Sequence, residues 1–448
     1  MVQDVNLPIM LENRELATHE QAMEILNNFT ASFQIVTISR IRGILSEELL
    51  RQALDIIQTR HPLLNSRIVA KSKSFWFETA AEKIPLSVVK KQQIQQWEEV
   101  VIQELNQKIN SDRNLLRVTL INFEQAKNIC YLITTIHHAI ADASSCIQLH
   151  SEILTSCQNI AEGKAQIQVN QLPQQPSINK LFPKSIQGFT GEIGIILYVL
   201  KLKLQLIRYQ PTTLKFEKNV PLKSRSCGLV HRKLVPELTT RLINACRQQK
   251  TTVQAALGAA MLFAVAKQTH ISDKNNHYFS NYLSFRSSVN LRSRLQPQIS
   301  NEHLGVMASA VMTFHKLKEN HNFWDLARDI KIKLEQDLVN GDAFRQIMIV
   351  KKIMVSFLKN PHKSSVTAAL TNIGRVNISQ NYGQLELEEI SFVPAQAAFG
   401  GIFSAAVSTF REQMVLHFMF SQPSMSTETV TILVDEMIAL LTDNLQQV

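Results

Sequence analysis

The stretch that most constrains this chain is a predicted strand that stops on two adjacent histidines. Residues 131–156 read YLITTIHHAIADASSCIQLHSEILTS, in which an apolar run leads to His137 and His138. Asp142 follows four residues after His138, and the small residues between them permit a tight turn before a helix that we expect to end near Asn159. Because successive strand residues point to opposite faces, one histidine should face a site and the other the core.

A histidine at a strand end is a candidate general base. Its near-neutral pKa allows it to accept a proton at cellular pH, and the strand holds it in place. Two purely structural histidines are the alternative. A metal site formed by His137, His138 and Asp142 is disfavoured because the two imidazoles should point in opposite directions. We expect Ser144 and Ser145 to cap the helix that follows.

Other nucleophilic and metal chemistry has weaker support. A serine hydrolase of the α/β-hydrolase type would need a GxSxG turn, which the sequence lacks. Cys146 falls inside a predicted buried helix turn, where a thiol is inert. The five cysteines are scattered without CxxC spacing, so they predict reduced thiols in a cytosolic protein and neither a disulfide framework nor a metal site.

The length of the chain favours two domains or two pseudo-symmetric halves, because 448 residues exceed what one core usually holds. Residues 1–20 lack a signal-peptide pattern, and no window has the roughly 18 apolar residues of a membrane span. We therefore expect a soluble, cytoplasmic protein, and a monomer. The formal charge of +10 suggests an acidic partner, but no recognisable nucleic-acid-binding motif is present, so nucleic acid is not expected.

Strands and helices alternate along both parts of the chain and indicate an α+β fold with mixed sheets. Thr18 and Gln21 have the spacing of a capping box, so a helix should begin near Thr18. The Gln- and Pro-rich residues 161–185 have no sustained period and are interpreted as a linker. After it we predict strands at 227–234, 277–286, 305–315, 383–393, 401–410 and 412–420, and helices at 236–249, 251–268, 322–338 and 427–446.

The heptapeptide HHAIADA, residues 137–143, resembles the HHxxxD signature of the condensation-domain and acyltransferase superfamily. That superfamily includes nonribosomal-peptide condensation domains, alcohol acetyltransferases, polyketide-associated acyltransferases and wax-ester synthases. Further segments resemble family stretches in the expected order along nearly the whole chain: RELATHE (14–20), RHPLLNSRI (60–68), TTVQAALGAAMLF (251–263), SVNLRSRL (288–295), HLGVMASAVMT (303–313) and TNIGRV (371–376).

The resemblance implies two chloramphenicol-acetyltransferase-like halves with mixed sheets, arranged as a V-shaped pseudo-dimer around a tunnel. We place the first half at 1–165, a linker with a basic amphipathic segment at 166–222, and the second half at 223–448. Ala143 stands where peptide-forming members usually have glycine, and no DFGWG motif is visible. These departures favour the O-acyltransferase branch, which comprises polyketide-associated acyltransferases and alcohol acetyltransferases.

In such an enzyme, His138 would be the general base that activates an alcohol, and His137, Asp142 and Arg292 would be structural or orienting residues, with Asp142 paired to Arg292. Ala143, Asn372, Ser404 and Thr409 are the expected lining residues. The acyl donor would be a thioester of coenzyme A or of an acyl-carrier protein. No permanently bound cofactor is expected. The product would be an ester of a hydroxylated lipid, polyketide or other specialised metabolite. An amide-forming condensation enzyme and a catalytically silent binding module are the alternatives.

Residues 192–210, EIGIILYVLKLKLQLIRYQ, predict a helix with one apolar stripe and basic residues beside it. A core or lid helix is one interpretation. The other is a helix that lies on an anionic membrane surface, which would suit a lipophilic substrate and make the protein peripheral to the membrane. The stripe consists of Ile193, Ile196, Leu197, Leu200, Leu204 and Ile207.

Overall fold

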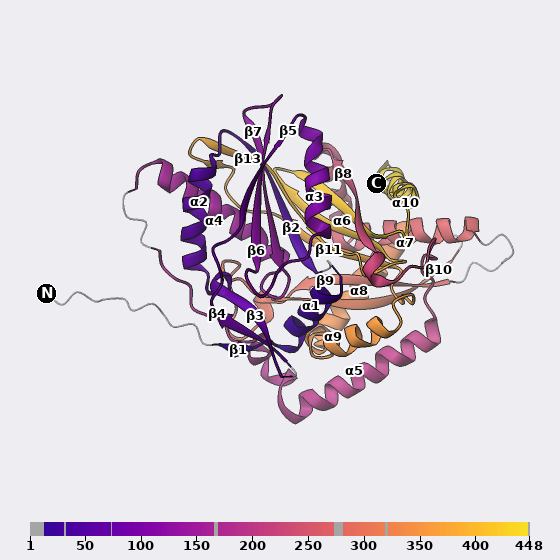
Figure 1. Cartoon of the computed structure of the whole chain (residues 1–448). Coiled ribbons are helices and arrows are strands. Elements are labelled where there is room, and N and C mark those ends of the chain that lie inside the picture. The colour runs from indigo at the N-terminus through magenta and orange to yellow at the C-terminus, as the bar shows by residue number, and fades with distance from the viewer. Residues whose placement is uncertain are drawn as a thin grey trace.

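The computed structural model describes residues 13–30, 33–72, 74–164, 169–272, 281–318 and 321–446. Residues 1–12, most of the segment examined for a signal peptide, therefore lie outside it, as do residues 165–168 of the predicted linker and the start of the strand predicted at 277–286. Within the described residues, the strands form two six-stranded sheets and one small three-stranded sheet, and helices surround the larger sheets (Figure 1).

The first large sheet has the strand order β12-β13-β2-β7-β6-β5. Its β5 and β6 pair in parallel and its other neighbours are antiparallel, so the sheet is mixed. Every residue of β7 is buried, as expected for a central strand that is covered on both faces. The strands are β2 (Gln34–Arg42), β5 (Leu86–Lys91), β6 (Leu116–Phe123), β7 (Ile129–His137), β12 (Asn381–Tyr382) and β13 (Leu385–Pro394).

Two helices pack on this sheet, and a third packs on one of them. Helix α2 (Glu47–Arg60) packs against α4 (Ala143–Ala161), which in turn lies against β2 and β13. The buried residues Leu50, Leu54 and Ile57 of α2 recur at helical spacing and form the stripe that faces the core. Helix α3 (Trp97–Asn106) contacts β2 and β7 and also reaches β8 of the second large sheet, so it lies between the two sheets.

The second large sheet has the order β10-β9-β11-β14-β15-β8, and β11 runs parallel to both of its neighbours. Helices α6, α7, α8 and α10 pack around it. Gly258 of α7 allows a close approach to β9, because a Cβ atom there would lie 2.5 Å from the ring of Phe285. The elements are β8 (Ser226–Leu234), α6 (Pro236–Gln248), α7 (Val253–Ser272), β9 (Asn281–Asn290), β10 (Ala308–Leu317), α8 (Phe323–Val339), β11 (Ala368–Arg375), β14 (Phe403–Phe410), β15 (Gln413–Gln422) and α10 (Thr427–Gln446).

The remaining elements connect the two halves or lie at the periphery. Helix α1 (Thr18–Phe29), from the start of the chain, packs against α9 (Asp342–Lys359), from its second half. The small sheet consists of β1 (Arg14–Glu15), β4 (Ser74–Thr79) and β3 (Ser66–Lys71). Helix α5 (Gly188–Tyr209) lies at the edge of the molecule, next to α9 (Figure 1).

The predicted α+β class with mixed sheets is confirmed, and three local predictions need correction. The capping box of α1 is wrong by one residue: Ala17 is the N-cap, and the Glu20 carboxylate, held by Arg14 at 2.7 Å, accepts the Ala17 N–H at 2.6 Å. The N-cap of α4 is Asp142, whose carboxylate accepts the N–H of Ser145 at 3.0 Å; of the two serines, Ser145 takes part in the capping, because its hydroxyl accepts the N–H of Asp142 at 3.1 Å. Helix α9 was not predicted.

One segment from the later part of the chain joins the first sheet. Strands β12 and β13, residues 381–394, lie within the segment assigned to the second half, yet β13 pairs with β2 in the first sheet from Ile35–Pro394 to Arg42–Glu386. The segment from 166 to 222 contains the long helix α5 together with extended chain. The boundaries at 165 and 222 remain a prediction.

Candidate active site

Strand β7 delivers the two histidines to the junction of the two halves. The His137 N–H donates to the Leu115 carbonyl at 2.8 Å, and the His138 N–H donates to the Phe33 carbonyl at 3.1 Å. The strand therefore ends at His137, and the chain turns before the N-cap of α4 at Asp142.

The side chain of His137 faces the core and is fully buried. Its Nδ1 accepts the N–H of Ala139 at 3.0 Å, so in the neutral ring the hydrogen resides on Nε2, which lies 2.9 Å from the Glu24 carboxylate. Burial raises the pKa of Glu24, but hydrogen bonds, first from His137 and then from Ser111, lower it by more, so this carboxylate is ionised. His137 is thus held by Glu24 of α1.

The side chain of His138 faces a cavity instead. Its Nδ1 lies 2.8 Å from the Ala141 carbonyl, which can only accept, so Nδ1 carries the hydrogen and Nε2 keeps a free lone pair. Burial lowers the pKa of His138 below its usual value, which keeps the ring neutral near pH 7. The arrangement leaves one basic nitrogen on a rigid strand end, beside the cavity.

Asp142 and Arg292 form the ion pair expected from the sequence, and both side chains are buried. The Arg292 guanidinium donates to Asp142 Oδ2 at 2.9 Å and to the Ser300 carbonyl at 2.7 Å. Asp142 Oδ2 also accepts the Met307 N–H at 3.0 Å. One carboxylate therefore caps α4 in the first half and holds the chain of the second half.

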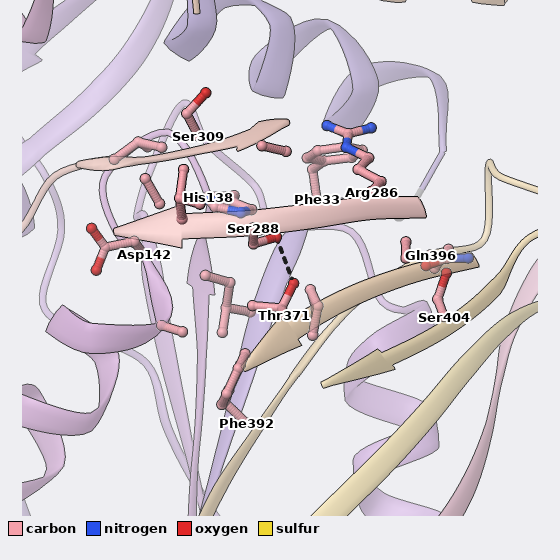
Figure 2. A pocket seen from close by; sticks show the side chains of 18 of the residues that line it. Phe33, His138, Asp142, Arg286, Ser288, Ser309, Thr371, Phe392, Gln396 and Ser404 are labelled. Atoms are coloured by element: carbon pink, nitrogen blue, oxygen red, sulfur yellow. Dashed lines mark hydrogen bonds between the residues drawn. The ribbon is translucent and has the colours of Figure 1, made fainter. Parts of the chain in front are cut away.

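The cavity has a volume of about 310 Å³ and lies between the halves. His138 and Phe33 line it from the first half, and Ser288 and Thr371 line it from the second. The hydroxyls of Ser288 on β9 and Thr371 on β11 are 2.8 Å apart (Figure 2). In such a pair one hydroxyl donates its hydrogen to the other, so the second hydroxyl can donate its own hydrogen to a bound group.

Three of the four residues predicted to line the cavity do so. Ala143, Asn372 and Ser404 line the cavity, whereas Thr409, farther along β14, is not among its lining residues. The Asn372 side-chain carbonyl accepts the N–H of Gly374 at 2.8 Å, so it is engaged in its own strand. The Ser404 hydroxyl is buried and has no hydrogen-bond partner among the described residues.

Several cavity residues were not predicted from the sequence. His19 of α1 lines the cavity, and burial lowers its pKa. Arg286, Ser288 and Thr371 come from neighbouring strands of the second sheet, and Gln396 comes from the segment after β13. His19 lies within the RELATHE segment that carries part of the resemblance, but no periodicity singled it out.

Two alternatives from the sequence can be compared with this geometry. Cys146 is buried in the first turn of α4, and burial raises the pKa of its thiol, so a thiolate is disfavoured there. Among the residues that the structure describes, no group of histidines, cysteines and carboxylates is arranged to hold a metal ion.

The described helices include none that would traverse a bilayer.

Comparison with known proteins relates the chain to acyl-transferring enzymes. Residues 224–425 match the family model described as the C-terminus of phthiocerol/phthiodiolone dimycocerosyl transferase. The chain is 20% identical over 304 residues to a protein of Fusarium pseudograminearum named "Probable alcohol acetyltransferase FCK4", a match that covers 63% of this chain and 60% of that relative's length.

Solved structures share the fold over almost the whole chain. Polyketide synthase associated protein 5 from Mycobacterium tuberculosis superposes with a TM-score of 0.69 at 15% identity, covering 96% of this chain and 98% of that one. The trichothecene 15-O-acetyltransferase TRI3 from Fusarium sporotrichioides superposes with a TM-score of 0.77 at 13% identity, covering 96% and 95%. The condensation domain of the Monacolin K polyketide synthase MokA gives 0.68 at 12% identity, covering 97% and 98%.

These likenesses confirm the predicted fold of two chloramphenicol-acetyltransferase-like halves, and the family model extends over most of the second half. The segments that resemble the superfamily, from residue 14 to residue 376, supply the strand end, the buried ion pair and part of the cavity described above. Residues 224–425 thus resemble the C-terminal part of one acyltransferase family, and the chain as a whole shares its fold with solved acetyltransferases and condensation domains.

Proposed function

We propose that this protein is an O-acyltransferase that moves an acyl group from a thioester to the hydroxyl of a second substrate. The observation that carries the proposal is the state of His138: its Nδ1 hydrogen is held by the Ala141 carbonyl, and its ring borders a cavity lined by both halves. A neutral imidazole with a free Nε2 is the form that accepts a proton from an alcohol.

In the proposed reaction, His138 Nε2 takes the proton of the acceptor hydroxyl while the oxygen attacks the thioester carbonyl carbon. The new C–O bond gives a tetrahedral intermediate, and its collapse breaks the C–S bond. The thiolate that leaves takes the proton from the imidazolium, which restores neutral His138. The free proton of the Ser288–Thr371 hydroxyl pair is suited to stabilise the negative oxygen of the intermediate.

The donor in this proposal is a thioester of coenzyme A or of an acyl-carrier protein, because a thioester is already activated. The acceptor is a hydroxylated lipid, polyketide or other specialised metabolite. The match to an alcohol acetyltransferase and the fold shared with a trichothecene O-acetyltransferase support an alcohol over an amine. Met23, Ile35 and Val350 give the cavity an apolar character that suits such acceptors.

The direct test is to incubate the protein with a pool of acyl-CoA thioesters and matched alcohol and amine acceptors, and to identify products by intact mass. We expect esters that form with the wild type and not with His138→Ala. Amides as the main products would contradict O-acylation. Turnover that is independent of His138 would contradict the assigned base.

We also propose that α5 contacts an anionic lipid surface. One stripe of this helix is exposed: Phe189, Ile193, Ile196, Leu197, Leu200, Leu204 and Ile207 each expose 42–77% of their surface. The opposite side of α5 is attached to the protein, where Tyr198 donates to Gln346 at 2.8 Å and Lys201 lies 2.8 Å from Asp337. Lys203 and Arg208 are exposed near the stripe, which matches an anionic headgroup region.

Vesicle flotation tests this contact. Wild-type protein should float with vesicles of phosphatidylcholine and phosphatidylserine and less with phosphatidylcholine alone, because the basic residues add electrostatic attraction. The variant Ile196→Glu/Leu200→Glu/Leu204→Glu should stay in the dense fraction. Ile332→Glu is the control, because Ile332 is also an exposed apolar residue, 51% exposed, but it lies on α8, outside the stripe. Equal flotation of the triple variant and the control would contradict the proposal.

A further inference from the structure

We propose that the cavity binds a carboxylate group of one substrate through the guanidinium of Arg286, at a position distinct from the reacting centre at His138. This inference rests on the proposed acyl transfer and deepens it, because it names a chemical class of substrate. The side chains that carry it are Arg286, Ser404 and Gln396, all of which line the cavity.

Arg286 is a cation without a counter-ion in the part of the chain that the structure describes. It lies on β9 and borders the cavity, yet no described carboxylate is within ion-pair distance and no described acceptor receives its hydrogen bonds. Arg292, six residues further along the chain, shows the contrast, since its guanidinium is paired with Asp142. Arg286 is half-buried, and a guanidinium remains charged in proteins, so its partial removal from water without a partner costs free energy unless a bound anion supplies one.

Two neutral donors near Arg286 also lack partners. The Ser404 hydroxyl and Gln396 Nε2 are both buried with no hydrogen-bond partner among the described residues, and Ser404 is only 3% exposed. Buried polar groups are normally hydrogen-bonded, so two unsatisfied groups in one cavity indicate that a ligand completes them. Figure 2 shows Arg286, Gln396 and Ser404 at the end of the pocket opposite Asp142.

The strand register brings Arg286 and Ser404 to the two sides of one small residue. Ala369 of β11 is aligned with Arg286 on β9 and with Ser404 on β14. Two strand spacings separate the Cα atoms of Arg286 and Ser404 by about 9–10 Å. The methyl side chain of Ala369 is too small to fill the space between them. A long arginine and a short serine can therefore both reach a group bound above it.

The position of Arg286 along β9 places the bound carboxylate away from the reacting atoms. The last residue of β9, Asn290, contacts Ser144 in the first turn of α4 at 3.3 Å, which puts this end of the strand beside the His138 turn. Arg286 lies four residues earlier, so its Cα is about 13 Å from that of Asn290. A substrate would therefore carry its reacting group near Ser288 and its carboxylate about two residues further along the strand.

A carboxylate fits these donors better than a phosphate monoester does. The planar guanidinium matches the two oxygens of a carboxylate, and one positive charge neutralises one negative charge. A phosphate monoester would bring a charge of about −1.5 to −2 against a single cation. The phosphates of the thioester donor are the competing source of negative charge, and the experiment distinguishes them.

The experiment uses matched pairs of probes. In the acceptor arm, ω-hydroxy carboxylic acids of increasing length are each compared with their methyl esters, with one acyl-CoA as donor. In the donor arm, mono-CoA thioesters of dicarboxylic acids are each compared with their methyl esters, with one neutral alcohol as acceptor. The variants are Arg286→Gln and, as the matched control, Arg247→Gln on the exposed side of α6.

We expect the acid to be preferred over its ester in one arm, at a length that spans from His138 to Arg286. Arg286→Gln should lower kcat/KM for that acid by roughly 10- to 150-fold and leave the ester nearly unchanged, because only the charged hydrogen bonds are lost. Arg286→Lys should keep part of the preference, and Arg247→Gln all of it. Arg286→Gln should unfold at a temperature equal to or higher than the wild type, since no counter-ion loses its partner and an unpaired charge is removed.

Three outcomes would overturn the inference: no acid preference in either arm, a preference that persists in Arg286→Gln, or an equal loss for acid and ester, which would assign Arg286 to the donor's phosphates. Calorimetric titration with an alkanoate and with its methyl ester provides a readout that does not depend on turnover. Alkanoate binding that requires Arg286, in a protein without transferase activity, would leave this inference standing while the proposed function fails.

Discussion

At the scale of single residues, His137 and His138 differ in which ring nitrogen carries the hydrogen. In His137 the backbone N–H of Ala139 occupies Nδ1, and Nε2 faces Glu24. In His138 the Ala141 carbonyl fixes the hydrogen on Nδ1 and leaves Nε2 free at the cavity. Two neighbouring residues of the same type therefore have different chemistry, because backbone groups on either side of the turn select their tautomers.

Replacement of His138 by alanine should lower the rate of acyl transfer by about 10²–10⁴-fold, the usual contribution of a general base. The free energy of unfolding should change little, because the ring borders a cavity. His137→Ala is the contrasting variant, and it should lose stability because it removes a fully buried ring that lies 2.9 Å from the buried Glu24 carboxylate. Steady-state rates and denaturant unfolding of both variants check this, and a His138→Ala enzyme with wild-type turnover would refute it.

The pH profile of kcat/KM offers a second check at this scale. The proposed base works only when Nε2 is unprotonated, and protonation occurs as the pH falls through its pKa. Burial lowers the pKa of His138, so the acid limb should lie below the ordinary value of about 6.5. An acid limb with its midpoint above that value would show that burial does not set the pKa of this imidazole.

The sequence was sufficient to locate some of these residues and not others. His138, Asp142 and Arg292 lie in segments whose residue types and order could be recognised. Arg286 and Ser404 could not be assigned a common site, because their proximity depends on both aligning with Ala369 across three strands. Thr409 was selected from the same strand as Ser404, but it does not line the cavity.

At the scale of secondary-structure elements, Asp142 connects the start of α4 to the second half of the chain. Its Oδ1 accepts the N–H of Ser145 within the helix, and its Oδ2 receives Arg292 and the Met307 N–H from across the junction. The turn that carries His138 lies directly before this helix. Any movement of the N-terminus of α4 relative to the second half would therefore displace the proposed base.

Asp142→Ala should lower the free energy of unfolding by about 3–5 kcal/mol, because it leaves the buried Arg292 cation without its partner. Asp142→Asn retains an N-cap side chain and should lose less than Asp142→Ala, so the difference between the two variants reports the cap. Chemical denaturation of both proteins measures these losses. An Asp142→Ala protein as stable as the wild type would show that the ion pair contributes nothing.

The elements themselves were predictable where a hydrophobic pattern is regular. The predicted helix at 322–338 and the strand at 383–393 agree with α8 and β13 to within about two residues. Helix α9 was missed although Phe344, Ile347, Val350 and Met354 are buried at helical spacing. It begins directly after Gly341, whose φ of 78° lets the chain reverse direction after α8. The prediction ended the helical region at residue 338 and did not anticipate a second helix after this reversal.

At the scale of the whole molecule, the buried His417 and the half-buried His231 lie where the two large sheets meet. The rings of His231 on β8 and His417 on β15 are 5.0 Å apart, and Trp97 of α3 lies 5.4 Å from the His231 ring. Burial lowers the pKa of His231 to about 4 and that of His417 well below its ordinary value. In α4, burial lowers the pKa of His150 to about 3.

These shifts predict a loss of stability in acid. A histidine with a lowered pKa in the folded state binds a proton more readily when unfolded, so each one destabilises the fold as the pH falls below about 6.5. The loss should continue down to the folded-state pKa, which is about 4 for His231, at about 1.4 kcal/mol per pH unit for each histidine that is neutral when folded and protonated when unfolded. Urea unfolding between pH 7 and 5 measures the slope, and His150→Gln should reduce it. A flat profile over that range would contradict the assignment.

The arrangement of the halves was the part least accessible from the sequence. Hydrophobic patterns indicated the strands, but the pairing of β13 with β2 joins residues about 350 positions apart, which no local pattern encodes. The resemblance to the superfamily supplied the two-half architecture, and the likeness to solved structures confirms it.

The pairing of β13 with β2 has a consequence for how the protein is made. A ribosome delivers β2 long before residues 385–394, so the edge of β2 that will receive β13 stays open during most of synthesis. An unpaired strand edge can associate with other chains. A nascent chain of this protein should therefore depend on holding factors until its last quarter has been translated, and the first half should not be obtainable as a stable separate fragment.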